Sequence, residues 1–374
     1  MKQEELALFL DELKELTDIE SPTYYKEGVT EVLNWFVKKA DSLGLKHKVL
    51  ELNSDKVADC LFISNNLEAD SYDILLVGHM DTVFPVGSVA KVPFTLKDGK
   101  INALGIIDDK AGALLSFYII KELDLDSINV GILLNSCEET GSAPSKEVIK
   151  EYARKSKQCL VLEPARPDGS LVATRKGIVA CVVDFHGVAA HAGNYHELGR
   201  SAVVEASNFI VELSKLTDYK AGHTFNAVMT SGGTAHNVVP DFASVTFEMR
   251  YRVSSSEQFL KEKLDEILAK PFIDGVTSKV TIANTLPPMI DEESLPRIKA
   301  LFDEVAKEQN TKVTWVDAGG ASDGNIISSV GCPVIDGLGP TGGEIHTHNE
   351  YMVVDSVVPK CNLVVEVIKR LTNS

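Results

Sequence analysis

The first 176 residues show helical periodicity alternating with short, continuous apolar runs. Helical stretches lie at 3–18, 25–43 and 110–123, and another begins near Ser145. The apolar runs between them are KHKVLEL, CLFIS, DILLVG, INVGILLNS and QCLVLEP. Continuous apolar strands separated by helices are typical of a sheet that is covered on both faces. This part of the chain is therefore predicted to be an α/β domain.

Between residues 177 and 287 the pattern changes to alternating, β-branched stretches. These are GIVACVVDFHG, TFNAVMTSGG, ASVTFEMRYRV and SKVTIAN, with helical stretches at 196–216 and 256–268. Two helices on one antiparallel sheet form a separate α+β unit. The α/β pattern then resumes, with helices at 293–309, near 323–329 and at 355–372, and strands KVTWV and CPVID. We predict one α/β domain from residues 1–176 and 288–374, interrupted by an α+β domain at 177–287.

Composition narrows the class of partners. The chain of 374 residues exceeds what one core usually supports, and its 37 basic and 54 acidic residues give a net charge of −17. Such a surface repels nucleic acid and anionic lipid, so neither is expected as a partner. No apolar run approaches the ~20 residues that span a bilayer, and the acidic amphipathic N-terminal stretch is unlike a signal peptide. Six scattered cysteines without CxxC spacing indicate reduced thiols, and we expect a cytoplasmic protein.

Polar residues that can bind a metal or move a proton gather where predicted strands end. LLVG is followed by His79 and Asp81, whose side chains share one side of the strand, so the carboxylate can orient the imidazole. The remaining candidates are Asp108, Asp109, Glu138, Glu139, Glu163 and His346. Each alone has a simpler explanation, since Asp108 or Asp109 suits a helix N-cap, the two glutamates suit a solvated turn, and a single histidine is often structural.

Together, two histidines and three carboxylates form a ligand set suited to zinc, with manganese or cobalt possible. If Asp108 and one water or hydroxide bridge two ions, His79 and Glu163 complete four ligands on one ion. Glu139 and His346 then do the same on the other, and paired hydrolytic metals lie ~3.5–4 Å apart. Three carboxylates against two dications leave a net positive charge that acidifies the bridging water.

The adjacent glutamates need separate roles because neighbouring side chains diverge. With Glu139 on a metal, Glu138 is left beside the bridging water as the general base that later returns the proton to the leaving amine. Asp81 fixes the tautomer of His79.

Eight motifs in order resemble the co-catalytic dizinc exopeptidase family, which includes the carboxypeptidase G type, aminoacylase, acetylornithine deacetylase, succinyl-diaminopimelate desuccinylase and peptidases T and V. The motifs are GHMDTV, GIIDDKAG, EETGS, LEP, AHAG, HNVVPDFASVTFEMRY, GGASDGN and HTHNEY. The resemblance implies a zinc-exopeptidase-like catalytic domain with a mixed central sheet and two Zn²⁺ per subunit. It assigns the metal to His79, Asp108, Glu139, Glu163 and His346, and catalysis to Glu138 with Asp81 in support. It also implies a cis peptide between Asp108 and Asp109.

The inserted domain would act, by the same resemblance, as a lid and as the interface of a homodimer. His191 would reach a neighbouring active site to steady the oxyanion, while Asn237 and Arg250 would hold the substrate's free carboxylate. Gly320 and Ser322 would line the pocket. In EIHTHNE two histidines compete for the metal, and His346 fits the family's spacing to Asn349 better than His348 does.

The function expected is hydrolysis of an amide bond next to a free carboxylate by a metal-activated water. A carboxypeptidase or di- or tripeptidase competes with an N-acyl-amino-acid deacylase, and the GHMDTV motif leans towards the first. A catalytically silent peptide-binding relative is a third alternative, disfavoured because the general base and every ligand are present.

Overall fold

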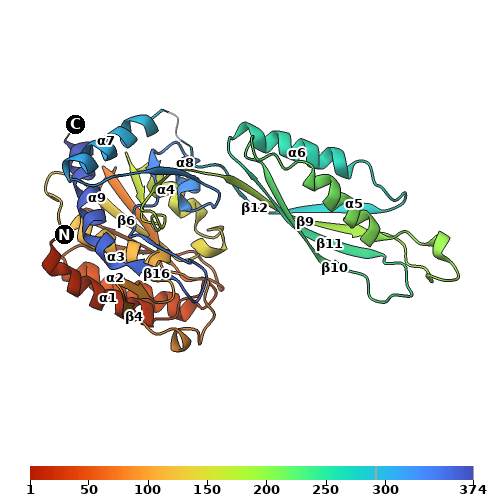
Figure 1. Cartoon of the computed structure of the whole chain (residues 1–374), viewed down its shortest axis with the longest axis horizontal. Coiled ribbons are helices and arrows are strands. Elements are labelled where there is room, and N and C mark those ends of the chain that lie inside the picture. The colour runs from red at the N-terminus through yellow and green to blue at the C-terminus, as the bar shows by residue number, and fades with distance from the viewer. Residues whose placement is uncertain (291–292, 374) are drawn as a thin grey trace. The chain divides into compact units, whose positions relative to one another are not determined.

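The computed structural model describes residues 1–290 and 293–373. The chain divides into a larger unit, made of Met1–Thr174, Met289–Ala318 and Ser322–Ser374, and a smaller unit, made of Arg175–Pro288 and Gly319–Ala321 (Figure 1). Three residues of the GGASD segment therefore group with the smaller unit. None of the helices in the described part of the chain is long and apolar enough to cross a membrane.

A six-stranded mixed sheet forms the centre of the larger unit. In spatial order its strands are β1 (Lys46–Leu50), β2 (Cys60–Ser64), β6 (Val130–Asn135), β3 (Ile74–His79), β7 (Cys159–Val161) and β14 (Val334–Ile335). β3 is parallel to β6 and β7, and β14 is parallel to β7, while β1 and β2 run antiparallel to their neighbours. The predicted α/β class with a mixed central sheet is confirmed.

Helices cover both faces of this sheet. They are α1 (Leu6–Asp18), α2 (Lys26–Ser42), α3 (Ala111–Ile120), α4 (Lys146–Arg154), α7 (Leu295–Glu308), α8 (Asp323–Ser328) and α9 (Val357–Thr372). Alternation along β2 shows the two faces, because Leu61 and Ile63 join the core formed with α1, α2, α3, α7 and α9. Phe62 points the other way and packs on Tyr152 of α4, with ring centroids 4.1 Å apart. Every residue of α3 is buried, so this helix lies inside the unit.

A small antiparallel sheet and the strand at Leu171–Arg175 were not predicted from the sequence. An antiparallel sheet has the order β15 (Gly342–Gly343), β16 (Tyr351–Val353), β5 (Lys100–Asn102) and β4 (Thr95–Lys97), and β8 (Leu171–Arg175) pairs with β13 (Trp315–Ala318). The strands of the antiparallel sheet have only two or three residues, too few to show a period of two. β13 overlaps the predicted strand KVTWV, whereas β8 was not predicted. The loop from β15 to β16 carries His346.

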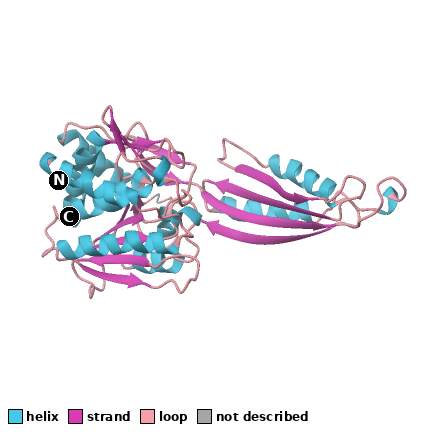
Figure 2. Ribbon diagram, turned by 90° about the horizontal axis from the view of Figure 1, so that it is seen from below, coloured by secondary structure: helices cyan, strands magenta, loops and turns pink. Residues whose placement is uncertain are grey.

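The smaller unit is a four-stranded antiparallel sheet with two helices on one face (Figure 2). The strand order is β10 (Thr224–Gly232), β11 (Phe242–Tyr251), β9 (Gly177–His186) and β12 (Thr277–Leu286), and the helices are α5 (Ala202–Ser214) and α6 (Ser255–Leu268). The predicted helix at 196–216 begins too early. Arg200 pairs its backbone with Val188, and Ser201 caps α5 by accepting a hydrogen bond from the backbone N–H of Val204.

Candidate metal centre

The candidate residues come from loops at one edge of the larger unit's sheet. Because β3, β6 and β7 are parallel, the segments that leave their carboxyl ends meet at the same edge. His79 ends β3, Glu138 and Glu139 form a short turn after β6, and Glu163 follows β7 by two residues. Asp108 lies in the turn before α3, and His346 lies between β15 and β16. Five separate segments thus supply the site.

Asp108 lies between the two histidines. Its Oδ1 is 3.1 Å from Nε2 of His79, and its Oδ2 is 3.2 Å from Nε2 of His346. One carboxylate oxygen therefore faces each imidazole, the arrangement that a bridging carboxylate needs. The peptide bond between Asp108 and Asp109 is cis.

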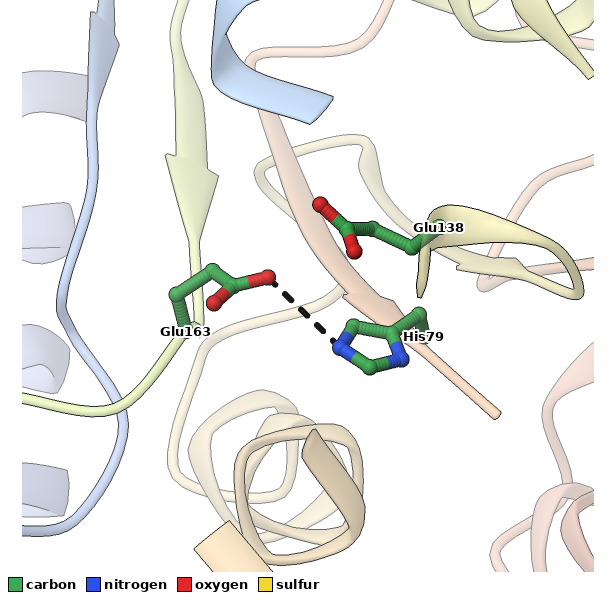
Figure 3. Close-up of side chains that lie close together, drawn as sticks. All are labelled: His79, Glu138 and Glu163. Carbon is green, nitrogen blue, oxygen red and sulfur yellow. Dashed lines mark ion pairs between the residues drawn. The ribbon is translucent and has the colours of Figure 1, made fainter. Parts of the chain in front are cut away.

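A glutamate accompanies each histidine. Oε1 of Glu163 lies 3.6 Å from Nε2 of His79, and Oε2 of Glu139 lies 3.1 Å from Nε2 of His346. Donor atoms of His79, Glu138 and Glu163 lie within 4.8 Å of one another, as do those of His79, Asp108 and Glu139. Figure 3 shows the carboxylate of Glu163 facing the imidazole of His79, with the carboxylate of Glu138 close to both. Imidazole nitrogens and carboxylate oxygens at such distances fit a divalent ion such as zinc.

Asp81 is fully buried and has three kinds of partner. Its Oδ1 lies 3.3 Å from Nδ1 of His79, whose ring nitrogen is also 3.0 Å from the Asp81 carbonyl oxygen. The Thr23 hydroxyl donates to Oδ2 at 2.6 Å. The backbone N–H groups of Glu138 and Glu139 donate to the two carboxylate oxygens. Asp81 thus holds both His79 and the glutamate turn.

The electrostatics of the cluster favour added positive charge. Hydrogen bonds to Asp108 and Glu139 raise the pKa of His346 to about 10. Burial opposes protonation of His79, but its hydrogen bonds to Asp108 and Asp81 raise its pKa well above the usual value. Burial, reinforced by the nearby Glu163 carboxylate, raises the pKa of Glu138. Crowded, partly desolvated carboxylates therefore attract cations, either protons or metal ions.

Glu350 and Asp109 are supporting residues to which the sequence analysis gave no such role. Glu350 is buried and accepts hydrogen bonds from the backbone N–H groups of Gly105, Ile107 and Asp108, which fixes the turn that presents Asp108. Oδ2 of Asp109 accepts the backbone N–H of His79 at 3.2 Å. Glu350 lies within the motif HTHNEY, and its place in that motif was the only sequence feature that could have indicated its role.

A buried triad of Asn135, Ser142 and Asp323 encloses the turn that carries Glu138. The Asn135 amide donates to the Ser142 hydroxyl at 2.9 Å and to Oδ2 of Asp323 at 2.8 Å, and the Ser142 hydroxyl donates to Oδ1 of Asp323. Both ends of the 136–142 loop are therefore tied to the first residue of α8. Sequence patterns gave no sign of this link.

The candidate substrate residues fall mainly in the smaller unit. His191 and Asn237 are exposed there, and Nδ1 of His191 accepts the backbone N–H groups of Gly193 and Asn194. Arg250 donates to both carboxylate oxygens of Glu248, and also to the Gly319 carbonyl at 2.7 Å.

The two candidate pocket residues of the GGASD segment, Gly320 and Ser322, belong to different units. The Gly320 carbonyl accepts a hydrogen bond from Arg175 within the smaller unit. Ser322, by contrast, belongs to the larger unit, where its buried side chain caps α8 and donates to Asp336. Its hydroxyl is thus engaged in holding the helix.

Imidazoles and carboxylates at the carboxyl ends of parallel strands, with an additional glutamate beside them, define a metal-dependent hydrolase by fold and site. The chain belongs to peptidase family M20/M25/M40, whose model matches residues 75–370. It is accordingly a hydrolase of the metallopeptidase and amidohydrolase type.

Similar proteins include both peptidases and a deacylase. Carboxypeptidase G2 of Pseudomonas sp. (strain RS-16) is 27% identical over 359 residues, covering 93% of this chain and 85% of that protein. Succinyl-diaminopimelate desuccinylase of Delftia acidovorans is 25% identical over 322 residues, covering 79% and 80% of the two chains. The crystal structure of a tripeptidase from Staphylococcus aureus subsp. aureus Mu50 superposes with a TM-score of 0.81 at 25% identity, covering 99% of both chains.

Proposed function

We propose that the protein is an exopeptidase that uses two zinc ions to hydrolyse the amide bond of a small peptide next to a free carboxylate. The observation that carries this proposal is the placement of Asp108 between His79 and His346, each histidine accompanied by its own glutamate. His79, Asp108 and Glu163 would hold one ion, and Asp108, Glu139 and His346 the other. When bound, such ions act as Lewis acids that acidify a water and polarise the scissile carbonyl.

Glu138 supplies the proton transfer. Its carboxylate lies among the ligand atoms of His79 and Glu163, and neither the bridging position of Asp108 nor the Glu139–His346 pair uses it. Glu138 takes the proton from the attacking water and gives it to the leaving amine.

The smaller unit would supply substrate recognition as a lid and would mediate a homodimer. Since Nδ1 of His191 accepts two backbone N–H groups, its proton sits on Nε2, which is then free to donate to an oxyanion. Arg250 already donates to the carboxylate of Glu248. A substrate carboxylate would therefore have to displace Glu248 or bind Arg250 together with it. Asn237 would be the second ligand of the substrate carboxylate, and Gly320 and Ser322 would line the pocket.

Metal reconstitution tests the centre directly. Chelated protein is loaded with zinc, cobalt or manganese, and the bound metal per chain is measured by elemental analysis alongside hydrolysis rates. We expect two ions per chain and complete loss of hydrolysis after chelation, restored by metal. Hydrolysis that survives chelation, or metal content that stays at background, would overturn the proposal. Light scattering of the loaded protein would give one chain's mass instead of two if the dimer is wrong.

An N-acyl-amino-acid deacylase is the second candidate function, because succinyl-diaminopimelate desuccinylase is among the relatives. Its reaction uses the same residues on a substrate whose acyl group is not an amino acid. Rates on matched dipeptides, tripeptides, N-acetyl and N-succinyl amino acids separate the two. We expect the peptides to be hydrolysed faster, and a preference for N-acyl substrates would assign the deacylase instead.

A further inference from the structure

A cleft of about 570 Å³ opens beside the metal centre of the larger unit. Glu139 and Thr140 line one part of it, and the other lining residues come from two loops. The lining residues are Pro22, Thr23, Tyr24, Tyr25, Thr82, Val83, Val86, Glu139 and Thr140. Glu139 accompanies His346 in the candidate centre, so the cleft is continuous with the place where an amide would be cleaved.

Large apolar side chains are exposed in this cleft. Tyr24 is 68% exposed and Val86 58% exposed, and Tyr25 and Val83 are also exposed. Four such side chains gathered at one place, next to the candidate centre, form a surface on which burial of an apolar group would be favourable.

The two walls of the cleft are fixed to each other by hydrogen bonds. Glu20 accepts the backbone N–H groups of Gly87 and Val89, and the Thr82 N–H donates to the Ser21 carbonyl at 2.8 Å. The Thr23 hydroxyl donates to Asp81, which in turn holds His79. The walls are therefore tied to the frame of the metal centre, and a group bound between them would be positioned relative to the metals.

The charge of the lining residues makes the cleft unsuitable for the half of the substrate that carries the free carboxylate. None of its lining residues, all of which the structure describes, is a lysine, arginine or histidine, and the one carboxylate among them belongs to Glu139. The amino acid released with a free carboxylate needs a cation that the lining residues do not supply, and an anionic side chain buried there would be left without a partner. The cleft therefore suits the uncharged group on the acyl side of the scissile bond.

We propose that this cleft, between Tyr24 and Val86, is the subsite for an apolar or aromatic group on the acyl side of the scissile amide. The inference rests on the proposed hydrolysis and adds the substrate class: peptides whose residue before the cleaved bond is leucine- or phenylalanine-like. Succinyl and glutamyl groups are poor occupants.

Dipeptides that share a C-terminal alanine and differ in the first residue test the subsite with the zinc-loaded protein. For the wild type we expect kcat/KM for phenylalanine and leucine to exceed that for glycine by about 10- to 100-fold, the size of discrimination that an apolar pocket provides. Glutamate in the first position should fall below glycine. Tyr24→Ala should reduce the ratio of phenylalanine to glycine by about tenfold.

Val86→Arg distinguishes an effect of charge in the cleft from an effect of misfolding. The new cation should raise kcat/KM for the glutamate dipeptide while lowering it for phenylalanine, and an opposite change on two substrates cannot come from misfolding. Val49→Arg is the matched control, because Val49 is an exposed valine on β1 outside the cleft, and it should leave both values unchanged.

The two proposals fail in different ways. If no member of the series is hydrolysed in a metal-dependent manner, the proposed function is wrong and the subsite falls with it. If hydrolysis is metal-dependent but glycine and glutamate match phenylalanine, or if Val86→Arg lowers all rates equally, the subsite alone is wrong.

Discussion

Oδ1 of Asp81 accepts a hydrogen bond from the backbone N–H of Glu138 at 3.1 Å. The same oxygen lies 3.3 Å from Nδ1 of His79. One buried carboxylate therefore fixes the orientation of a candidate metal ligand and the position of the candidate general base. Sequence spacing had indicated only the first of these two roles.

Asp81→Asn should weaken metal binding and slow hydrolysis. The amide has one oxygen where the carboxylate has two, so it cannot serve His79 and both backbone N–H groups. Loss of such a supporting partner typically costs ~10–100-fold in metal affinity. Competition with a fluorescent zinc chelator measures the affinity, and kcat is measured at saturating zinc.

Thr23→Val is the control for this prediction, because it removes one hydrogen bond to Asp81 and leaves the carboxylate in place. Its effect on zinc affinity should be smaller than that of Asp81→Asn. Unchanged affinity and kcat in Asp81→Asn would contradict the positioning role.

Glu138→Gln should lower kcat by ~10²–10⁴-fold, the usual contribution of a general acid–base group, while the protein still binds its metals. The substitution keeps the shape of the side chain and removes its ability to accept a proton. Steady-state kinetics and elemental analysis on the same preparation measure both quantities. Glu147→Gln, at an exposed position of α4, is the control, with activity unchanged. A Glu138→Gln protein that retains full kcat would require another base.

Asp323→Ala should reduce kcat in addition to stability. Removing the carboxylate takes away one hydrogen-bond acceptor of the buried Ser142 hydroxyl and of the buried Asn135 amide. This loss should lower the free energy of unfolding by ~1–3 kcal/mol. The 136–142 loop would then shift, and misplacing Glu138 should cost roughly tenfold or more in kcat. Urea unfolding and kinetics of the folded protein measure the two effects.

Asp323→Asn is the conservative partner of this test, since it keeps one oxygen for the Asn135 amide and should recover part of the lost kcat. If Asp323→Ala lowers the free energy of unfolding but leaves kcat of the folded protein unchanged, Asp323 is structural only.

The sequence was informative where a regular pattern met a strand end. Apolar runs located β3, β6 and β7, and parallel packing implied that His79, Glu139 and Glu163 would meet. The pattern could not show Glu350 or Asp323 as anchors. Their partners are backbone N–H groups and an amide that tertiary folding brings close, over separations of 242–245 residues for Glu350 and 188 for Asp323 with Asn135.

Contacts that no motif reveals limited the prediction of the substrate residues as well. Motif likeness assigned Arg250 to a carboxylate, and the structure shows that Glu248 on the same strand already provides one. The cleft at Tyr24 and Val86 was not seen from sequence because its two loops share no periodic pattern, and only hydrogen bonds such as Glu20 to Gly87 bring them together.

Lys360 of α9 provides a pH-dependent test that is separate from the metal centre. Its side chain is buried, and desolvation lowers its pKa to about 7 from 10.5. Between these values the unfolded chain binds more protons than the folded one, so the free energy of unfolding should rise with pH. The destabilisation caused by burying Lys360 is complete below pH 7 and disappears above the pKa of the unfolded chain. Lys360→Met should add roughly 1–3 kcal/mol at pH 7 and flatten the rise. Urea unfolding between pH 7 and 9.5 measures the free energy of unfolding. Lys369→Met, at an exposed position of the same helix, is the control. Equal dependence of this free energy on pH in the wild type and both variants would contradict the burial of a charge at Lys360.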